Sequence, residues 1–442
     1  MKRIQGTALA LLLLLAAWTP PAPAILQIEI TQGVEGALPI AVLSFLRELK
    51  GPLDQYPAEV IRADLHRSGR FSPEQGVAPL RLDADEMSRL LRTWKARKVD
   101  YLLVGALREL APDRYRVEFR LFDTLRGEQL LGRSTVVRAA DLRSVAHRIS
   151  DAIYQQLLGV PGAFDTRVAY VVVKGRGKAR RYELQVADAD GHNPRTVYRS
   201  AQPIMSPAWS PDSRRLAYVS FEGGRPAVWM QDLASGERRK LSARPGINGA
   251  PAWSPDGKRL ALTLSQDGNP ELYLLELASG RLTRLTRNRA IDTEPAWSPD
   301  GKALYFTSDR SGSPQIYRLE LSGGSPRRIT WEGRYNASAD PGPRDEQLAL
   351  VHQVGSDFRI AVLDRRQGLL RVLTDGRLDE SPSLSPNGAM IIYATEERGR
   401  GVLAAVSSDG RVRQVLRLQE GEVREPAWSG YLQKRPDNRI VR

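Results

Sequence analysis

The feature that most constrains this chain is the phrase Pro-Ala-Trp-Ser-Pro-Asp, which recurs at a fixed spacing. Three full copies place tryptophans 44 residues apart, and the same register continues through three weaker copies. The six positions of the register are Trp209, Trp253, Trp297, Pro341, Leu384 and Trp428. A period of this length indicates a repeat architecture in which each unit buries its apolar faces against its neighbours. More than half of the chain therefore folds as an array of similar units.

Each repeat predicts four short strands. The tryptophan ends a first strand of small and apolar residues, and Ser-Pro-Asp follows it as a tight turn. Proline presets φ at the second turn position, and the serine and aspartate side chains bond the turn backbone. Two apolar strands and a short polar strand complete the unit. Four strands in roughly 40–50 residues are typical of one blade of a β-propeller.

The register predicts six blades and a particular way of closing the ring. The last copy, Glu425–Ser429, has no strands after it, and Val168–Val173 has no first strand before it. Pairing these two segments completes a mixed last blade and leaves no open sheet edge in the ring. The fourth copy, SADPGPRDEQLALV, lacks the tryptophan and has extra prolines. This departure predicts an irregular inner strand in that blade.

Acidic residues recur in the loops that lead into the first strands. Two interpretations of these acidic residues are open. They could ring the channel mouth and hold a cation or a peptide, or they could cap turns. The tryptophans and Ser-Pro-Asp turns are interpreted as packing and turn residues, and none is nominated as a ligand. The acidic residues are Asp292, Glu294, Asp379, Glu380 and Glu425.

The first residues, MKRIQGTALALLLLLAAWTPPAPA, have early cations, a short apolar run and an Ala-Pro-Ala end. This pattern is typical of a secretory signal peptide, with cleavage expected after Ala24. The apolar run is too short for a membrane span, so we expect export to the periplasm without membrane insertion. The expected division is a signal peptide at 1–24, an α/β domain at 25–160, a propeller at 165–432 and a basic tail at 433–442.

Residues 25–160 predict a small mixed α/β domain, because strand-like and helix-like patterns alternate along them. The fold class is therefore a two-domain chain, with this domain followed by a six-bladed β-propeller. The expected strands are Ile25–Ile30, Pro39–Phe45, Tyr101–Leu107, Tyr115–Phe122 and Gln129–Val137. The expected helices are Tyr56–Ser68, Met87–Lys98 and a last one from Leu142 to Leu157.

Residues that carry chemistry are scarce. There is no cysteine, and the four histidines, His66, His147, His192 and His352, have no metal-ligand spacing. His66 and His147 fall on predicted helices and are interpreted as surface groups. No nucleophile elbow is present, and no motif for nucleic acid supports such a partner. The net charge of +14 is compatible with a solvated basic surface or with attraction to an anionic partner such as peptidoglycan, lipid headgroups or an acidic protein.

Several longer segments resemble one family. They include PIAVLSF at 39–45, GAFDTRVAYVV at 162–172, the stretch around the first Trp-Ser-Pro-Asp copy at 200–225, LTRNRAIDTEPAWSPDG at 285–301 and RRITWEGRYNASAD at 327–340. Together with the domain order, they resemble the TolB family of the Tol-Pal cell-envelope system of Gram-negative bacteria. The likeness extends from the signal peptide to about Leu432.

The resemblance implies a non-enzymatic periplasmic scaffold without a cofactor, expected to be a monomer. Its implied partners are the Pal lipoprotein, bound at the propeller mouth, and the C-terminal domain of TolA, bound by the mature N-terminus. The implied role is to support outer-membrane integrity and constriction at division. The TolA-binding residues would be Ile25, Leu26, Gln27, Ile28, Glu29, Ile30 and Thr31. The Pal-binding residues would be Met205, Ser206, Ile247, Asn248, Gly249, Ala250, Thr293 and Glu294.

Two other classes of function stay open, a propeller enzyme and a carbohydrate-binding propeller. Related propellers occur in peptidases and lyases, but a peptidase requires an appended hydrolase domain, and only about ten residues follow Leu432. A lyase requires histidine-rich metal ligation in the channel, and the four histidines do not supply it. The other alternative is a generic carbohydrate-binding propeller. One departure bears on partner contacts, since family members often carry histidine where this chain has Ile247.

Overall fold

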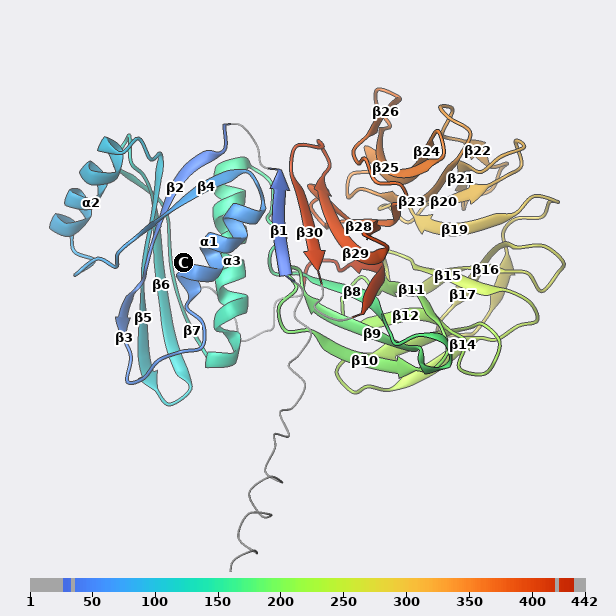
Figure 1. Cartoon of the computed structure of the whole chain (residues 1–442), viewed down its shortest axis with the longest axis horizontal. Coiled ribbons are helices and arrows are strands. Elements are labelled where there is room, and N and C mark those ends of the chain that lie inside the picture. Colours follow the sequence, from blue (N-terminus) through green and yellow to red (C-terminus); the bar gives the residue numbers. More distant parts are fainter. Residues whose placement is uncertain (1–26, 33–35, 418–420, 433–442) are drawn as a thin grey trace, which may run out of the picture.

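The computed structural model describes residues 27–32, 36–417 and 421–432. The expected signal peptide, Ile25, Leu26 and the expected basic tail lie outside these residues. The described residues form a small N-terminal domain beside a β-propeller (Figure 1). No helix among them is long and apolar enough to cross a bilayer.

The N-terminal domain is built on a mixed sheet with strand order β4-β2-β5-β6-β7, and β3 pairs with β5. Strand β2 is parallel to β4 and β5, whereas β5, β6 and β7 form an antiparallel meander. The strands are β2 (Leu38–Leu43), β3 (Leu46–Glu48), β4 (Phe71–Gly76), β5 (Tyr101–Ala111), β6 (Arg114–Asp123) and β7 (Glu128–Val137). The helices are α1 (Pro57–Arg67), α2 (Ala84–Ala96), the 3-10 turn η1 (Ala139–Asp141) and α3 (Leu142–Leu158).

Helices cover both faces of this sheet. Helices α1 and α3 pack on the face toward the propeller, and α2 packs on the opposite face (Figure 1). Local sequence sets the helix ends. Proline is tolerated in the first turn of α1, and Asp83 accepts a hydrogen bond from the Glu86 amide to cap α2. Gly159 ends α3 with a left-handed backbone.

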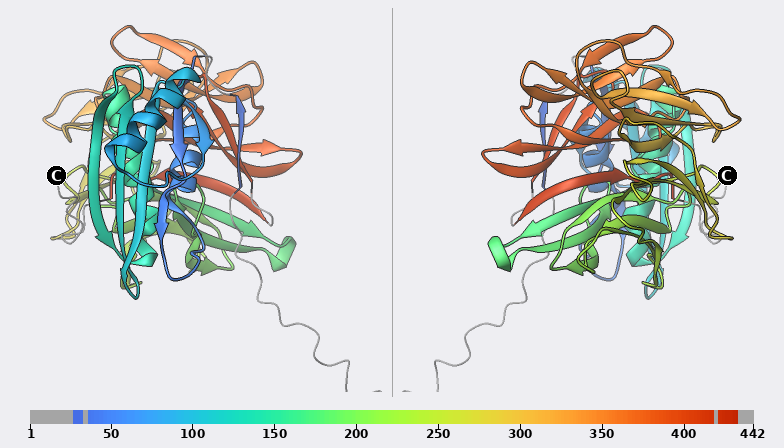
Figure 2. Two further views of the ribbon diagram at one scale, coloured as in Figure 1. Left: turned by 90° about the vertical axis from the view of Figure 1, so that its left-hand side faces the viewer. Right: turned by 90° about the vertical axis from the view of Figure 1, so that its right-hand side faces the viewer.

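The propeller has six blades. Figure 2 shows them from two further sides. Four blades are consecutive in sequence, in strand order β11 to β14, β15 to β18, β19 to β22 and β23 to β26. Their strands are β11 (Ile204–Trp209), β12 (Arg215–Ser220), β13 (Ala227–Asp232), β14 (Arg238–Ser242), β15 (Asn248–Trp253), β16 (Arg259–Leu264), β17 (Glu271–Glu276), β18 (Leu282–Arg284), β19 (Asp292–Trp297), β20 (Ala303–Ser308), β21 (Gln315–Glu320), β22 (Arg327–Arg328), β23 (Asn336–Pro341), β24 (Gln347–Val354), β25 (Asp357–Asp364) and β26 (Leu369–Val372).

The two remaining blades take strands from distant parts of the chain. One contains β27 to β30 with β1 added outside β30, and the other has the order β31-β8-β9-β10. The expected closure is confirmed, because β31 pairs antiparallel with β8 from Glu422 opposite Val173 to Trp428 opposite Val168. The strands of these two blades are β1 (Gln27–Gln32), β8 (Arg167–Lys174), β9 (Arg181–Asp188), β10 (Arg195–Ser200), β27 (Glu380–Leu384), β28 (Met390–Glu397), β29 (Arg400–Ser407), β30 (Arg413–Arg417) and β31 (Glu422–Trp428).

The repeated tryptophans tie each inner strand to the preceding blade. Trp253 donates its indole N–H to the Ala208 carbonyl oxygen at 3.2 Å, and Trp297 donates to the equivalent Ala252 at 3.0 Å. In the turn that follows Trp253, the Ser254 hydroxyl accepts the Arg259 amide. These residues therefore stabilise blades and turns, which confirms the interpretation from sequence.

The expectation of an irregular inner strand in the fourth blade is wrong. Strand β23 pairs with β24 through the same register shift as the other inner strands. Where the tryptophan series is interrupted, Asp340 accepts the backbone N–H of Leu384 at 2.6 Å. A carboxylate-to-amide bond thus links β23 to β27 in place of an indole-to-carbonyl bond. The prolines of this copy lie at the end of the strand and in the following turn, where no ladder N–H is needed.

Candidate partner-binding surfaces and the domain interface

The central channel of the propeller opens as a cavity of about 500 Å³. Each inner strand contributes the residues around its Pro-Ala-Trp segment. The same register position in five of the six blades carries Ser206, Ala250, Glu294, Ser338 and Glu425, and Ser381 is its equivalent in the sixth. One continuous wall therefore surrounds the channel, built from equivalent positions.

All six residues at this position have left-handed backbones, with φ between 45° and 53°. None is glycine, so each adopts a conformation that L-residues seldom take. The cause is the register shift in every inner strand, which leaves this residue unpaired in the ladder. The resulting backbone geometry brings amide groups and side chains together at the channel wall.

Two glutamates bond to these amides. Glu425 accepts the Ser206 N–H at 3.2 Å. Glu294 accepts the Ser338 N–H at 3.0 Å and the Ser338 hydroxyl at 2.7 Å. Burial raises the pKa of Glu425 to about 7, and the carboxylates of Glu380 and Glu294 act in the same direction. The channel therefore contains a carboxyl group that titrates near neutral pH.

The five acidic residues expected at the mouth divide into two groups. Asp292 forms two 2.8 Å contacts with Arg310, and Asp379 accepts the hydroxyls of Thr374 and Thr395. Both are buried and hold their loops, as the turn-capping alternative predicts for them. Glu294 and Glu425 instead line the channel, and Glu380 is exposed.

The expected Pal-binding residues lie around this channel, although not all of them are available for contact. Met205 and Ile247 are 41% and 46% exposed, and Ser206, Ala250 and Glu294 line the cavity. Gly249 and Thr293 occupy the same register position as Met205.

The side chain of Asn248 is buried in its own loop, where its Oδ1 accepts the Arg244 amide at 2.9 Å and its Nδ2 donates to the Arg244 carbonyl at 2.7 Å. It shapes the loop without presenting its amide group to solvent.

Sequence reasoning missed three further exposed apolar side chains in the loops that precede the inner strands of other blades. They are Ile291, Trp331 and Leu378, which are 47%, 73% and 46% exposed. Applying the repeat register to these loops would have found them, because Ile247 and Ile291 immediately precede the equivalent strands β15 and β19. Exposed apolar side chains thus occur before the inner strands of more blades than the sequence analysis selected.

The N-terminal segment lies on the outer edge of a blade. Strand β1 pairs antiparallel with β30, with Ile28 opposite Leu416 and Ile30 opposite Gln414 (Figure 1). A register shift follows Ile30. The segment is therefore joined to the propeller by an edge-strand ladder and is connected to the N-terminal domain by the chain that follows.

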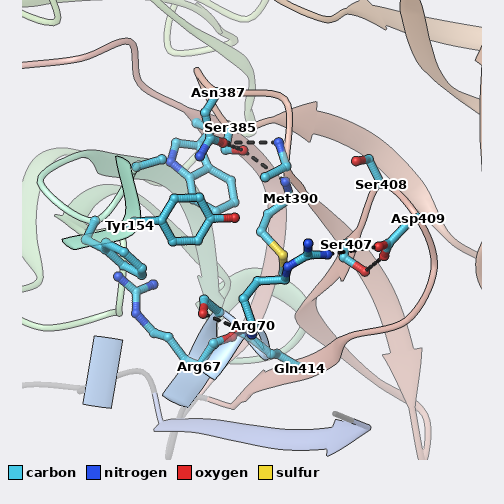
Figure 3. A pocket seen from close by; sticks show the side chains of 15 residues that line it. Arg67, Arg70, Tyr154, Ser385, Asn387, Met390, Ser407, Ser408, Asp409 and Gln414 are labelled. Atoms are coloured by element: carbon cyan, nitrogen blue, oxygen red, sulfur yellow. Dashed lines mark hydrogen bonds and ion pairs between the residues drawn. The ribbon is translucent and has the colours of Figure 1, made fainter. Parts of the chain in front are cut away.

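A cavity of about 190 Å³ lies between the two domains (Figure 3). Arg70 forms a 3.4 Å ion pair across it with Asp409. The Tyr154 ring lies at the cavity with its hydroxyl directed inward (Figure 3). The volume is below the range of about 300–1,000 Å³ usual for small-molecule sites, so the cavity is better described as part of the domain interface. Its other principal lining residues are Arg67, Phe164, Ser385, Met390, Gln414 and Trp428.

Beside this cavity, His147 is buried, so its interpretation as a surface group is wrong; the interpretation of His66 as exposed is correct. His147 Nδ1 lies 2.7 Å from an Asp64 carboxylate oxygen, and Nε2 lies 3.8 Å from Asp190 of the propeller. The helix pattern concealed this arrangement, because α3 packs a second face against the β9–β10 turn. The donor atoms of this trio lie within 4.8 Å of one another, but Arg67 and Arg143 already pair with the two carboxylates.

The fold and these surfaces define a two-domain β-propeller binding protein. Family models match it on both sides of the domain boundary, as the TolB amino-terminal domain at residues 26–130 and the TolB beta propeller domain at residues 154–432. The chain belongs to the TolB family of the Tol-Pal system, and it is a non-catalytic propeller scaffold.

Similar proteins cover almost the whole chain. The Tol-Pal system protein TolB of Thioalkalivibrio sulfidiphilus is 60% identical over 428 residues, which are 96% of this chain and 98% of that protein. The protein of the same description from Xanthomonas euvesicatoria is 53% identical and covers 92% and 93% of the two chains. The crystal structure of TolB from Acinetobacter baumannii has a TM-score of 0.83 and 42% identity, and the likeness covers 92% of this chain and 100% of that one.

Proposed function

We propose that this chain is a periplasmic scaffold that binds the Pal lipoprotein at the channel mouth of its propeller and the C-terminal domain of TolA through its mature N-terminus. It thereby supports outer-membrane integrity and constriction at division. Membership of the Tol-Pal system supports partners within that system. The expected signal peptide, with cleavage after Ala24, supports a location in the periplasm.

The observation that carries the Pal assignment is a set of exposed apolar side chains in the segments that lead into the channel wall. Met205 directly precedes Ser206, and Ile247 lies three residues before Ala250; Ser206 and Ala250 line the cavity of about 500 Å³. Exposed apolar groups around a concave surface are typical of a protein–protein interface. The polar wall with Glu294 and Glu425 offers acceptors for the partner at its centre. We therefore assign the Pal contact to Met205, Ser206, Ile247, Gly249, Ala250, Thr293 and Glu294, and we assign to Asn248 the role of holding this loop.

The TolA assignment is supported by the way β1 is held. A terminal strand at a sheet edge is bound mainly by backbone hydrogen bonds, and the same groups can pair with a strand of another protein. We assign this contact to Ile25–Thr31. The docked β1 and a TolA-bound segment would then be alternative states of one strand.

The test of the Pal surface is Ala250→Arg, measured by calorimetric titration with the purified periplasmic part of Pal. Ala250 lines the cavity and has a small side chain, so an arginine places a long charged chain in the contact. We expect affinity to fall by about 2 kcal/mol or more, the range of central interface residues.

Ala234→Arg is the matched control, because Ala234 is exposed in the outer turn between β13 and β14. It should bind Pal as the unchanged chain does. Equal affinity of both folded variants would contradict the assignment of the channel mouth. Binding of a peptidoglycan glycan with no binding of Pal would instead favour a carbohydrate-binding propeller.

A further inference from the structure

The interface between the two domains contains a buried cluster of charged side chains centred on His147. Asp64 and Arg67 come from α1, His147 and Arg143 from α3, and Asp188 and Asp190 from the end of β9 and the turn after it. The side chains of His147 and Asp64 are 3% and 1% exposed, and those of Arg67, Arg143 and Asp190 are 12–14% exposed. The cluster therefore joins the N-terminal domain to the propeller away from bulk water.

Both ring nitrogens of His147 face carboxylate oxygens. Nδ1 is 2.7 Å from Asp64, and Nε2 is 3.8 Å from Asp190 and has no hydrogen-bond partner. An ionised carboxylate only accepts hydrogen bonds, whereas a neutral histidine has one nitrogen that can only accept. A neutral ring would therefore turn a lone pair toward one of the two carboxylates. The doubly protonated ring has one N–H group on the side of each carboxylate and can donate to both carboxylates.

The balance of charges in the cluster also favours the doubly protonated, cationic ring of His147. Three carboxylates, those of Asp64, Asp188 and Asp190, share this region with two guanidinium groups. Arg67 lies 3.2 Å from Asp64, and Arg143 pairs with Asp190 and lies 3.6 Å from Asp188. Asp188 also accepts a 2.9 Å hydrogen bond from Asn193 Nδ2, and burial and the charge of Asp190 raise its pKa. The three carboxylates still outnumber the two guanidinium groups, and a cationic His147 balances the charge of the cluster, which matters because an unpaired buried charge is costly.

We propose that His147 is a proton-operated latch between the two domains. With both nitrogens protonated, the ring bridges Asp64 of the N-terminal domain and Asp190 of the propeller. Loss of one proton leaves an uncompensated negative charge at the interface and weakens the docking of the domains. The latch is a property of the fold and does not depend on which partners the chain binds.

The electrostatics of the neighbours determine the direction of the pH effect. Burial alone would lower the pKa of His147, but the charges of Asp64 and Asp190 outweigh burial and raise the pKa above 6.5, whereas Arg67 opposes them. His192, in the same turn as Asp190, has its pKa lowered by burial and by Arg143, so it does not take over this role. A histidine with a raised pKa stabilises the docked state fully below pH 6.5, and the contribution is lost as the pH rises through the raised value.

The experiment places one spin label in each domain of the mature chain. The chain has no cysteine, so Ala140→Cys and Ala234→Cys, both exposed, supply the attachment sites. Interdomain distance distributions are then recorded by pulsed electron paramagnetic resonance from pH 6 to pH 9. We expect a narrow distribution at pH 6 that broadens as the pH rises. If docking raises the pKa of His147 by one, the docking constant changes about tenfold between the two ends of the titration.

Three variants separate the latch from simple packing. His147→Gln should give the broad distribution already at pH 6 and remove most of the pH dependence. His66→Gln, an exposed histidine on α1, should behave like the unchanged chain. Adding Asp188→Asn to His147→Gln restores the charge balance and should narrow the distribution again, which a purely steric role would not do.

A histidine titration by NMR on the unchanged chain keeps the test decisive if His147→Gln does not fold. The four histidine resonances are few enough to resolve, and His147 should titrate above pH 6.5. Titration at or below pH 6.5 would overturn the proposal. So would interdomain distances that are the same at all pH values in the unchanged chain.

Discussion

One residue at the register shift of each inner strand has a left-handed backbone in all six blades, and in five of them it is followed by proline. For non-glycine residues this conformation costs about 1–2 kcal/mol each, yet alanine, serine and glutamate occupy the six positions. Glycine would remove the strain, but it would also remove the side chains that line the channel. We interpret the retained side chains, such as those of Glu294 and Glu425, as components of the mouth.

At the scale of single residues, Glu425 predicts how the stability of the chain depends on pH. Its pKa is raised on folding from 4.5 to about 7, so the folded chain binds more protons than the unfolded chain in that interval. Stability therefore falls as the pH rises from about 4.5 to about 7, by up to about 1.4 kcal/mol for each pH unit crossed. Glu425→Gln should reduce the decrease in Tm between pH 5 and pH 8, measured by circular dichroism.

The matched control is Glu237→Gln, an exposed carboxyl in an outer turn. It should keep the decrease in Tm of the unchanged chain. If Glu425→Gln also kept it, the carboxyl group in the channel would not be the source of the pH dependence.

At the scale of elements, one strand decides whether the ring is closed. Strand β31 supplies the inner strand next to β8, and Trp428 donates its indole N–H to Thr166 at 2.9 Å. Removing residues 420–442 would expose the inner edge of β8, which is almost wholly buried. We expect a loss that approaches the total stability of a typical domain, about 5–15 kcal/mol.

The comparison is with a chain that lacks only residues 433–442 and so keeps β31. That chain should melt like the full mature chain, whereas the longer deletion should melt far lower or aggregate. An unchanged Tm for the longer deletion would contradict closure by β31.

The outer edges of the blades are protected in two ways. Several outer strands carry arginines, such as Arg327 and Arg328 in β22 and Arg238 in β14, and charged side chains on an edge strand oppose edge-to-edge association. Strand β30 is instead covered by β1. Because β1 is the outermost strand of this sheet, the pairs from β27 to β30 do not include it.

At the scale of the whole molecule, the two proposed partner surfaces lie on different parts of one propeller, the outer edge at β30 and the channel. Deletion of Ile25–Thr31 should abolish TolA binding, since it removes the proposed strand. If docking of β1 on β30 also biases the propeller, the deletion should shift Pal affinity, because coupling between two sites is reciprocal and typically about 1–3 kcal/mol. Calorimetry with each purified partner measures both effects.

Equal Pal affinities for the full and shortened mature chains would leave the segment as a simple tether. Retained TolA binding by the shortened chain would contradict the assignment of the segment itself. Ala250→Arg in the full chain is the reciprocal control, since it should weaken Pal binding while the β1 strand remains present.

The domain interface also reaches the strand that holds β1. Gln414 of β30 donates its side-chain N–H to the Arg67 carbonyl oxygen, and Arg67 pairs with Asp64 of the histidine cluster. Gln414 is the residue opposite Ile30. One residue of β30 therefore contacts the N-terminal domain through its side chain and is paired with β1 through its backbone.

The architecture of this chain could be predicted from its sequence. The 44-residue register and its tryptophans predicted six blades, the closure of Glu425–Ser429 on Val168–Val173, and the turns, because these features depend on local turn chemistry and on packing between equivalent positions. The same register placed Ser206, Ala250 and Glu294 at equivalent positions, which the structure gathers around one channel.

Tertiary structure alone decided the features that depend on contacts between distant segments. Asp340 links the fourth blade to the next one through a residue 44 positions away, and no local pattern distinguishes it from a loop aspartate. His147 is buried because α3 packs against the propeller turn that carries Asp190 as well as against its own sheet. Helical periodicity reports which face of a helix is apolar, but a polar face acquires its partners only when the two domains meet.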